Sequence, residues 1–321
     1  MLDHDIRDLH LTHQLNGIVR TRDLTIPGER SDFYRRVRAG EFTRVVRGAY
    51  LPTTTWNELG PDAQYRVVVA ASDRPGFVFS HHSAAAMWRL PWIGPWPHRI
   101  HLAEQADAGR LSTPAITRHT TGVPPSVEVI DGLTVTSLAR TVVDLACALT
   151  FERAVTIADA ALRRTAHPLG GLPATTLSRH DLQHELARVP VNRGAVKARN
   201  VIAFADPQAD RPGESLSRVS MLRARLPAPQ LQAPLRGRSG REWRVDFYWP
   251  GNRLIGEFDG EWKYTNPEFA NERTPKRILL DEKFREDDLR AANYGFARWG
   301  WGMARSPAQL RRHLLDAGLQ A

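Results

Sequence analysis

The stretch "VDFYWPGNRLIGEFDGEWKY", residues 245–264, decides the fold of the C-terminal region because it places two strand patterns around a turn. Before the turn, apolar and polar residues alternate, so the apolar side chains share one strand face and Asp246 lies on the other. "PGN" is a turn signal, and "RLIGEFDG" predicts a returning strand on which Glu257 and Asp259 share a face. The hairpin is therefore expected to bring Asp246 beside Glu257.

Two carboxylates held this close repel each other unless a cation lies between them. Their oxygen atoms suit Mg²⁺ or Mn²⁺, so Asp246 and Glu257 are the predicted metal ligands. Such a cation polarises a phosphoryl oxygen and activates water, and Lys263 beyond the Gly260 turn is placed to steady negative charge. The pattern predicts phosphodiester hydrolysis. The alternative is that Asp246 and Glu257 belong to an outward polar face, that Asp259 favours the turn at Gly260, and that Lys263 is a surface charge.

The whole chain is consistent with a nucleic-acid partner. Its 321 residues predict two or three domains, and its net charge of +9 favours an anionic partner, DNA before a membrane. Cys147 is the single cysteine, which excludes an internal disulfide framework. No segment has the unbroken apolar length of a membrane span, and the charged N-terminus does not fit a signal peptide. We therefore expect a cytoplasmic protein.

Residues 1–55 predict a winged helix-turn-helix. A first helix is followed by a brief helix begun by Thr21, and "SDFYRRVRAGEF" predicts a third, capped by Ser31 and ended at Gly40. "TRVVRGAYLP" predicts two short strands around Gly48. Residues 29–47 contain six arginines and three acidic residues. The predicted DNA contacts lie on the third helix and the wing: Arg35, Arg36, Arg38, Arg44 and Arg47. The alternative is a solvated charged helix.

The N-terminal sequence resembles the winged helix of AbiEi-type antitoxins. The resemblance is carried by "RRVRAGEFTRVVRGAYLP" and continues through "FSHHSAAAMWRLP" and "LTVTSLARTVVDLACAL", covering about the first 165 residues. It implies DNA binding, with a cognate toxin as a candidate second partner.

Residues 56–195 predict a mixed α/β middle domain. "DAQYRVVVAAS" and "SAAAMWRL" predict helices, and "HRIHLAE" and "PAITRHTT" predict strands. Two further helices are predicted after Ser137, which is a candidate cap. The tryptophans of "LPWIGPWPH" either stack on a base or fold over their own core. The histidines at 81, 82, 98 and 101 are candidate metal ligands, with a structural role as the alternative.

Residues 206–321 predict a third domain. It resembles nuclease-like proteins related to very-short-patch-repair endonucleases, within the PD-(D/E)XK superfamily. The matching text lies over about residues 205–305: "GESLSRV", "VDFYWP", "LIGEFDGEWKY", "EKFREDDLR" and "FARWGW". The resemblance implies a restriction-endonuclease-like domain with a central mixed sheet, metal ligands at Asp246 and Glu257, a helix-borne acid at Glu214 and a further acid at Asp259. The chain departs from the family's acid-X-lysine pattern, because Asp259 stands where lysine is expected.

The long charged helix that follows predicts further DNA contacts. Arg285 and Arg290 are candidates for backbone phosphates, although pairing with acids of the same helix is an equal alternative. Arg298 lies in the predicted last strand, between apolar neighbours, and is a candidate for the scissile phosphate. Glu214 has its own alternative role, which is to favour a helix N-terminus electrostatically.

The sequence thus predicts a mixed α/β protein of three domains and leaves two functions open. The first is a Mg²⁺-dependent or Mn²⁺-dependent DNA endonuclease positioned by the winged helix. The second is an antitoxin-like transcriptional regulator whose nuclease-like domain is inactive. The sequence defines neither the DNA target nor the oligomeric state.

Overall fold

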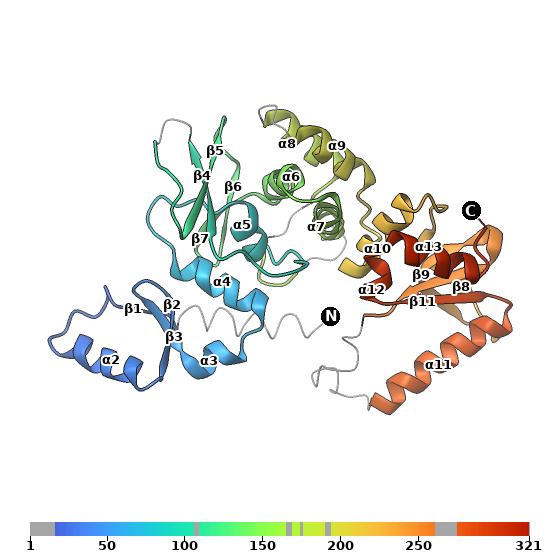
Figure 1. Ribbon diagram of the computed structural model, residues 1–321, viewed down its shortest axis with the longest axis horizontal. Helices are drawn as coiled ribbons and strands as arrows, with labels where there is room; N and C mark the ends of the chain where they lie inside the picture. The colour runs from blue at the N-terminus through green and yellow to red at the C-terminus, as the bar shows by residue number, and fades with distance from the viewer. Residues whose placement is uncertain are drawn as a thin grey trace. The chain divides into compact units, whose positions relative to one another are not determined.

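The computed structural model describes residues 17–105, 109–164, 169–173, 176–189, 194–260 and 275–320. Helices and several small sheets alternate, which confirms the predicted mixed α/β class (Figure 1). The chain divides into two compact units, residues 1–157 with 164–203 and residues 158–163 with 204–321. The predicted winged helix and middle region therefore belong to one unit.

Among the described residues, the N-terminal part of the first unit has two helices and a three-stranded sheet of order β1-β3-β2. Its elements are β1 (Val19–Arg20), α2 (Glu29–Arg38), β2 (Phe42–Val46), β3 (Ala49–Pro52) and α3 (Thr53–Glu58). The first helix that the sequence predicts, before Gly17, lies outside the described residues. The predicted hairpin around Gly48 is confirmed, and that glycine has φ +79°. Phe33 anchors α2 on the sheet, with ring centroids 5.0 Å from Phe42 and 5.2 Å from Tyr50.

Two local predictions for this part are wrong. Residues 21–27 form turns rather than a brief helix. The next helix begins at Glu29 after Gly28, so Ser31 lies inside its first turn and cannot cap it. Its predicted end is confirmed, because α2 stops at Arg38 and Gly40 has φ +81°.

The rest of the first unit surrounds a buried core containing Trp88, Met87 and Phe79. Phe79 bridges Leu102 and Val135, which joins the β4-β5 pair to the β6-β7 pair. Ser137 caps α6 as predicted, accepting a hydrogen bond from Arg140 N. The elements are α4 (Pro61–Ala71), α5 (His81–Met87), β4 (Ile100–Gln105), β5 (Ile116–Thr121), β6 (Val127–Ile130), β7 (Leu133–Thr136), α6 (Leu138–Ala148), α7 (Phe151–Arg163), α8 (Arg179–Arg188) and α9 (Ala195–Phe204). Residues 158–163 of α7 are grouped with the second unit.

The second unit is built on a four-stranded mixed sheet of order β11-β10-β9-β8. A central mixed sheet is what the resemblance implies for this region. Its parallel pair is β10-β11, and the other pairs are antiparallel. The elements are α10 (Pro212–Arg223), β8 (Gln230–Arg236), β9 (Glu242–Trp249), a 3-10 turn η1 (Pro250–Asn252), β10 (Leu254–Phe258), α11 (Pro275–Ala291), β11 (Gly295–Trp299), α12 (Trp301–Ala304) and α13 (Pro307–Asp316).

Helices cover both faces of this sheet (Figure 1). On one face, Phe247 and Trp299 pack with apolar residues of α10 and α13. On the other, Ile255 packs with Leu289 of α11. Burial of these side chains supplies most of the stabilisation, at about 25 cal/mol per Å² of apolar surface removed from water. The candidate site lies at the edge of the sheet formed by the C-terminal end of β10, beside α10 and α11.

Candidate functional site

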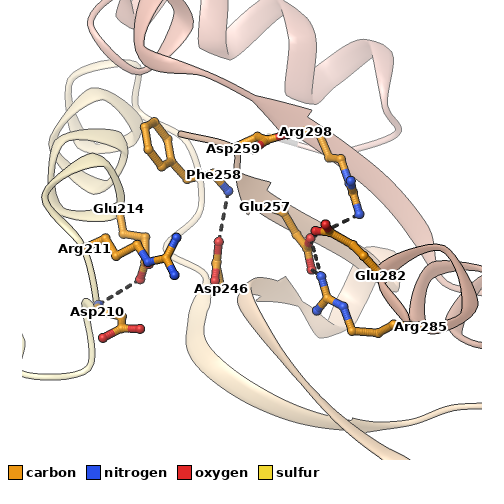
Figure 2. A pocket seen from close by; sticks show the side chains of 10 residues that line it. All are labelled: Asp210, Arg211, Glu214, Asp246, Glu257, Phe258, Asp259, Glu282, Arg285 and Arg298. Carbon is orange, nitrogen blue, oxygen red and sulfur yellow. Dashed lines mark hydrogen bonds and ion pairs between the residues drawn. The ribbon is translucent and has the colours of Figure 1, made fainter. Parts of the chain in front are cut away.

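A polar pocket of about 190 Å³ lies at this edge of the second unit (Figure 2). It gathers side chains from five elements and the segment before α10. Six carboxyl groups face three guanidinium groups and one phenyl ring: Asp210, Arg211, Glu214, Asp246, Glu257, Phe258, Asp259, Glu282, Arg285 and Arg298. The predicted acids at 214, 246, 257 and 259 therefore share one pocket, which is the convergence that the sequence predicts.

Asp246 is fixed by a break in the sheet. The β9-β10 ladder runs from the Leu254–Trp249 pair to the Gly256–Phe247 pair and ends there. Beyond it, Asp246 Oδ2 accepts a hydrogen bond from Phe258 N at 3.0 Å (Figure 2). The carboxylate thus satisfies a backbone donor that has lost its partner strand, and this contact holds Asp246 at the pocket.

Glu214 enters from the first turn of α10 and is 2% exposed. Gly213 allows the helix to approach so closely, because a Cβ there would lie 2.0 Å from Cε1 of Phe258. Glu214 Oε2 accepts hydrogen bonds from Asp210 N at 2.9 Å and from Gln232 Nε2 at 3.1 Å. Burial first, and then the charge of Asp246, raise the pKa of Glu214 to about 8.

Glu257 lies on β10 beside Arg298 of β11, its partner in the parallel register. Both carboxylate oxygens accept hydrogen bonds from Arg285 Nη2, at 2.7 and 2.6 Å (Figure 2). Arg298 Nη2 lies 3.5 Å from Glu257 Oε2. Burial raises the pKa of Glu257, the guanidinium of Arg285 opposes that rise, and the charge of Asp246 adds to it.

The remaining predicted site residues have mixed outcomes. Asp259 lines the pocket directly after β10, and Arg298 lines it from between buried Ala297 and Trp299. Lys263 lies outside the described residues. The cations that line the pocket, among residues the structure describes, are three arginines.

Sequence reasoning missed Asp210, Arg211 and Glu282 as pocket residues. The first two precede α10 in a turn-rich segment, where no periodic pattern marks them. Arg285 is predicted as a phosphate contact or a partner of acids on its own helix, and the structure pairs it with Glu257 of the sheet. Arg290 follows the helical alternative and pairs with Glu286 four residues before it.

The donor set fits a hard divalent cation in chemistry, since carboxylate oxygens are the ligands that Mg²⁺ and Mn²⁺ prefer. The negative charge of Asp246 raises the pKa of both Glu214 and Glu257, so a positive charge placed among these three carboxylates would be stabilised. In the described part of the chain, however, no group of three or more His, Cys, Asp or Glu side chains has the geometry of a metal centre.

The predicted DNA-contacting arginines of the first unit are all exposed. Two of them carry acid partners: Arg35 Nη2 lies 2.8 Å from Asp32, and Arg36 Nε lies 2.7 Å from Glu41. Within the described residues, no ion pair involves the other three, Arg38, Arg44 and Arg47. The Arg35–Asp32 pair lies within α2, and the Arg36 pair joins α2 to Glu41 beyond its end. Arg44 and Arg47, on and beside β2, carry positive charge outside any ion pair among the described residues.

Four histidines of the first unit form a cluster, defined as His81, His82, His101 and His119. His98, which the sequence grouped with three of them, is exposed, and His119 takes its place through the parallel β4-β5 pair. The rings of His81 and His119 stack at 3.5 Å, and His101 Nδ1 lies 2.8 Å from His119 Nε2. This arrangement is that of a packed core rather than a metal centre.

Burial and neighbouring positive charge keep the cluster neutral. They lower the pKa of His82 to about 4 and that of His101 to about 3, and burial alone lowers the pKa of His119 to about 4. Burial also lowers the pKa of His81 well below its ordinary value. Asp144 lies beside the cluster, 3.8 Å from His81 Nδ1.

The tryptophans of the proline-rich loop contact their own unit. Trp92 and Trp96 stack with ring centroids 4.7 Å apart, and Trp96 also stacks on Tyr65 at 4.7 Å. Trp96 Nε1 donates a hydrogen bond to Asp62 Oδ1 at 2.7 Å. These contacts correspond to the second of the two predicted roles, a loop folded over its own core.

Comparisons with known proteins place the chain near uncharacterized sequences. No family model matches it. The uncharacterized proteins MT2308 and Rv2248 of Mycobacterium tuberculosis are each 35% identical to it over 146 residues, which is 45% of this chain. The chain spans about half the length of these curated relatives, 50% in each case.

One solved structure, that of the Rv2827c protein from Mycobacterium tuberculosis, is similar at 16% identity with a TM-score of 0.35. The match covers 71% of this chain and 86% of that chain. At this TM-score the likeness supports no argument about fold or function.

None of the helices in the described ranges is both long and apolar enough to cross a membrane.

Proposed function

We propose that the protein is a metal-dependent endonuclease that hydrolyses phosphodiester bonds of DNA. The observation that carries this proposal is the meeting of Glu214, Asp246 and Glu257 in one pocket, from a helix and two strands. Buried carboxylates whose charges oppose one another's ionisation are stabilised by a bound cation. Exposed arginines on the winged helix support DNA as the substrate.

The proposed role of each pocket residue follows from its contacts. A divalent cation bound at Asp246 and Glu257 would polarise a phosphoryl oxygen and lower the pKa of a bound water. Phe258 N donates a hydrogen bond to Asp246, so the sheet sets the position of the Asp246 carboxylate. Glu214, with a pKa of about 8, can hold or accept a proton near neutral pH. Arg298 and Arg211 supply donors for phosphate oxygens.

Plasmid nicking in Mg²⁺ tests the proposal. Asp246→Asn keeps an acceptor for Phe258 N and removes the charge, so we expect a stable protein whose cleavage falls about 10²-fold or more. Glu242→Gln is the matched control, because Glu242 is an exposed acid on the same strand. A wild-type protein that leaves plasmid intact in both Mg²⁺ and Mn²⁺ would refute the enzyme.

The second candidate is a DNA-binding regulator, antitoxin-like, whose nuclease-like domain is inactive. It is favoured by the contact of Arg285 with both oxygens of Glu257, because that pair neutralises a predicted metal ligand from within the chain. Salt-dependent DNA binding in a gel shift, together with no cleavage by purified protein, is the outcome that supports this candidate. A cognate toxin would then be the expected second partner.

A further inference from the structure

Arg285 is held at three points inside the pocket wall. Its Nη2 donates to both oxygens of Glu257, and its Nη1 donates to the carbonyl oxygen of Arg244 at 3.0 Å. The two charged side chains are 19% and 9% exposed, so little solvent screens the pair. Figure 2 shows the guanidinium pointing from α11 toward Glu257 and the centre of the pocket.

The helix that carries Arg285 is itself fixed in place. One turn later on α11, Asp288 accepts hydrogen bonds from Trp243 Nε1 at 2.7 Å and from Ser239 N at 2.7 Å. Gly237 permits this approach, since a Cβ there would lie 2.0 Å from Asp288 Oδ2. The position of Arg285 therefore follows from the packing of α11 on the β8-β9 hairpin, and not from its pair with Glu257 alone.

The second arginine near Glu257 is in a different situation. Arg298 Nη2 lies 2.9 Å from Glu286 Oε2, closer than its 3.5 Å to Glu257. Arg298 thus keeps an acid partner whatever happens at Glu257. Arg285 makes the closer contact of the two with Glu257, which is a predicted metal ligand.

We propose that Arg285 is an internal counter-ion of the site, which competes with a divalent cation for Glu257 and moves its hydrogen bonds to a DNA phosphate when the cation is bound. The inference rests on the proposed function. A guanidinium is suited to this exchange because its planar fork matches a phosphate as well as a carboxylate. It also supplies a positive charge in a site where Asp259 stands in the place of the expected lysine.

The exchange predicts coupling between metal and DNA. Metal bound at Glu257 removes the partner of Arg285, and a phosphate in the pocket restores one. Each ligand therefore raises the affinity for the other, and thermodynamic linkage requires the two factors to be equal. In the protein without DNA, the Arg285–Glu257 pair weakens metal binding.

Calorimetric titration of the full chain with Mn²⁺, alone and with a short phosphorothioate duplex that resists cleavage, tests this role. In the wild type, DNA should tighten Mn²⁺ binding by about 5-fold or more. In Arg285→Met, Mn²⁺ alone should bind about 10-fold more tightly than in the wild type, and DNA should add little. Arg285→Lys, which keeps the charge, should return Mn²⁺ affinity toward the wild-type value. Arg312→Met, at an exposed position of α13 in the same unit, is the control and should change neither measurement.

The outcomes separate this inference from the proposed function. Mn²⁺ binding that is unchanged or weaker in Arg285→Met refutes the counter-ion role and leaves the endonuclease proposal standing. The absence of Mn²⁺ binding to every variant refutes both. If Arg285→Met does not fold, Arg285→Gln removes the charge while keeping hydrogen-bond donors, and the same tightening of Mn²⁺ binding is expected.

Discussion

Acidification should destabilise the first unit through the histidine cluster. The perturbation is a change from about pH 7.5 to about pH 5.5, which crosses the unfolded histidine pKa of about 6.5. In the folded chain the pKa values of His82, His101 and His119 lie at about 4, 3 and 4, so these rings stay neutral over that range. The unfolded chain binds protons that the folded chain does not, and stability is therefore lost as pH falls below about 6.5.

The magnitude follows from linkage. At about pH 5.5 each such histidine lowers the free energy of unfolding by about 1.4 kcal/mol. Asp144 acts in the opposite direction, because burial raises its pKa to about 6 and the folded state therefore gains a proton on acidification. This gain offsets about 0.8 kcal/mol of the loss in the free energy of unfolding. With solvent screening at the half-buried rings of His82 and His119, we expect a net loss of about 2–3 kcal/mol.

Urea unfolding followed by hydrogen exchange of β4 and α5 peptides measures this loss within the first unit. Changing both His101 and His119 to Gln should remove more than half of the pH dependence. The matched control replaces His180 and His184, two exposed histidines of α8, and should leave the pH dependence intact. Stability that is equal at the two pH values, or a pH dependence unaffected by the cluster variant, would show that the reasoning is wrong.

Three further results are expected. Gly213→Ala should lower the free energy of unfolding of the second unit by about 1–3 kcal/mol, since its Cβ would overlap Phe258; Gly251→Ala, with open space around it, is the control in the same urea titration. Lys263→Met should leave DNA binding intact and reduce plasmid cleavage about 10²-fold, and an unchanged rate would assign the charge elsewhere. Replacing Arg38, Arg44 and Arg47 with alanine should lower the slope of log affinity against log salt concentration, measured by gel shift, by about one per lost phosphate contact. Replacing Arg35 and Arg36, which have acid partners, should lower that slope less.

Local sequence patterns predicted the elements of the site well. The alternation before Pro250 defines β9, and a turn followed by an apolar run defines β10, so the closeness of Asp246 and Glu257 followed from one hairpin. Pro212 at the start of α10 likewise placed Glu214 in a first turn. Each of these depends on neighbours within a few residues.

Features that depend on tertiary packing were not predictable. The pair between Arg285 and Glu257 spans 28 residues and exists because α11 packs on the sheet. The histidine cluster needed the parallel register of β4 and β5, which brings His119 to His101 and leaves His98 exposed. Ser31 failed as a cap for a local reason, because Gly28 and Glu29 offered an earlier start.

Under the proposed endonuclease function, the hydrogen bond from Phe258 N to Asp246 also determines which substitutions at position 246 remove catalysis and keep the fold. A change to Asn removes a negative charge but still satisfies the backbone donor, so the sheet edge survives. A change to Ala or Val leaves that donor unsatisfied at a partly buried position and weakens the fold as well. On that proposal, Asn at position 246 is the substitution expected to remove catalysis at the lowest cost to the stability of the second unit.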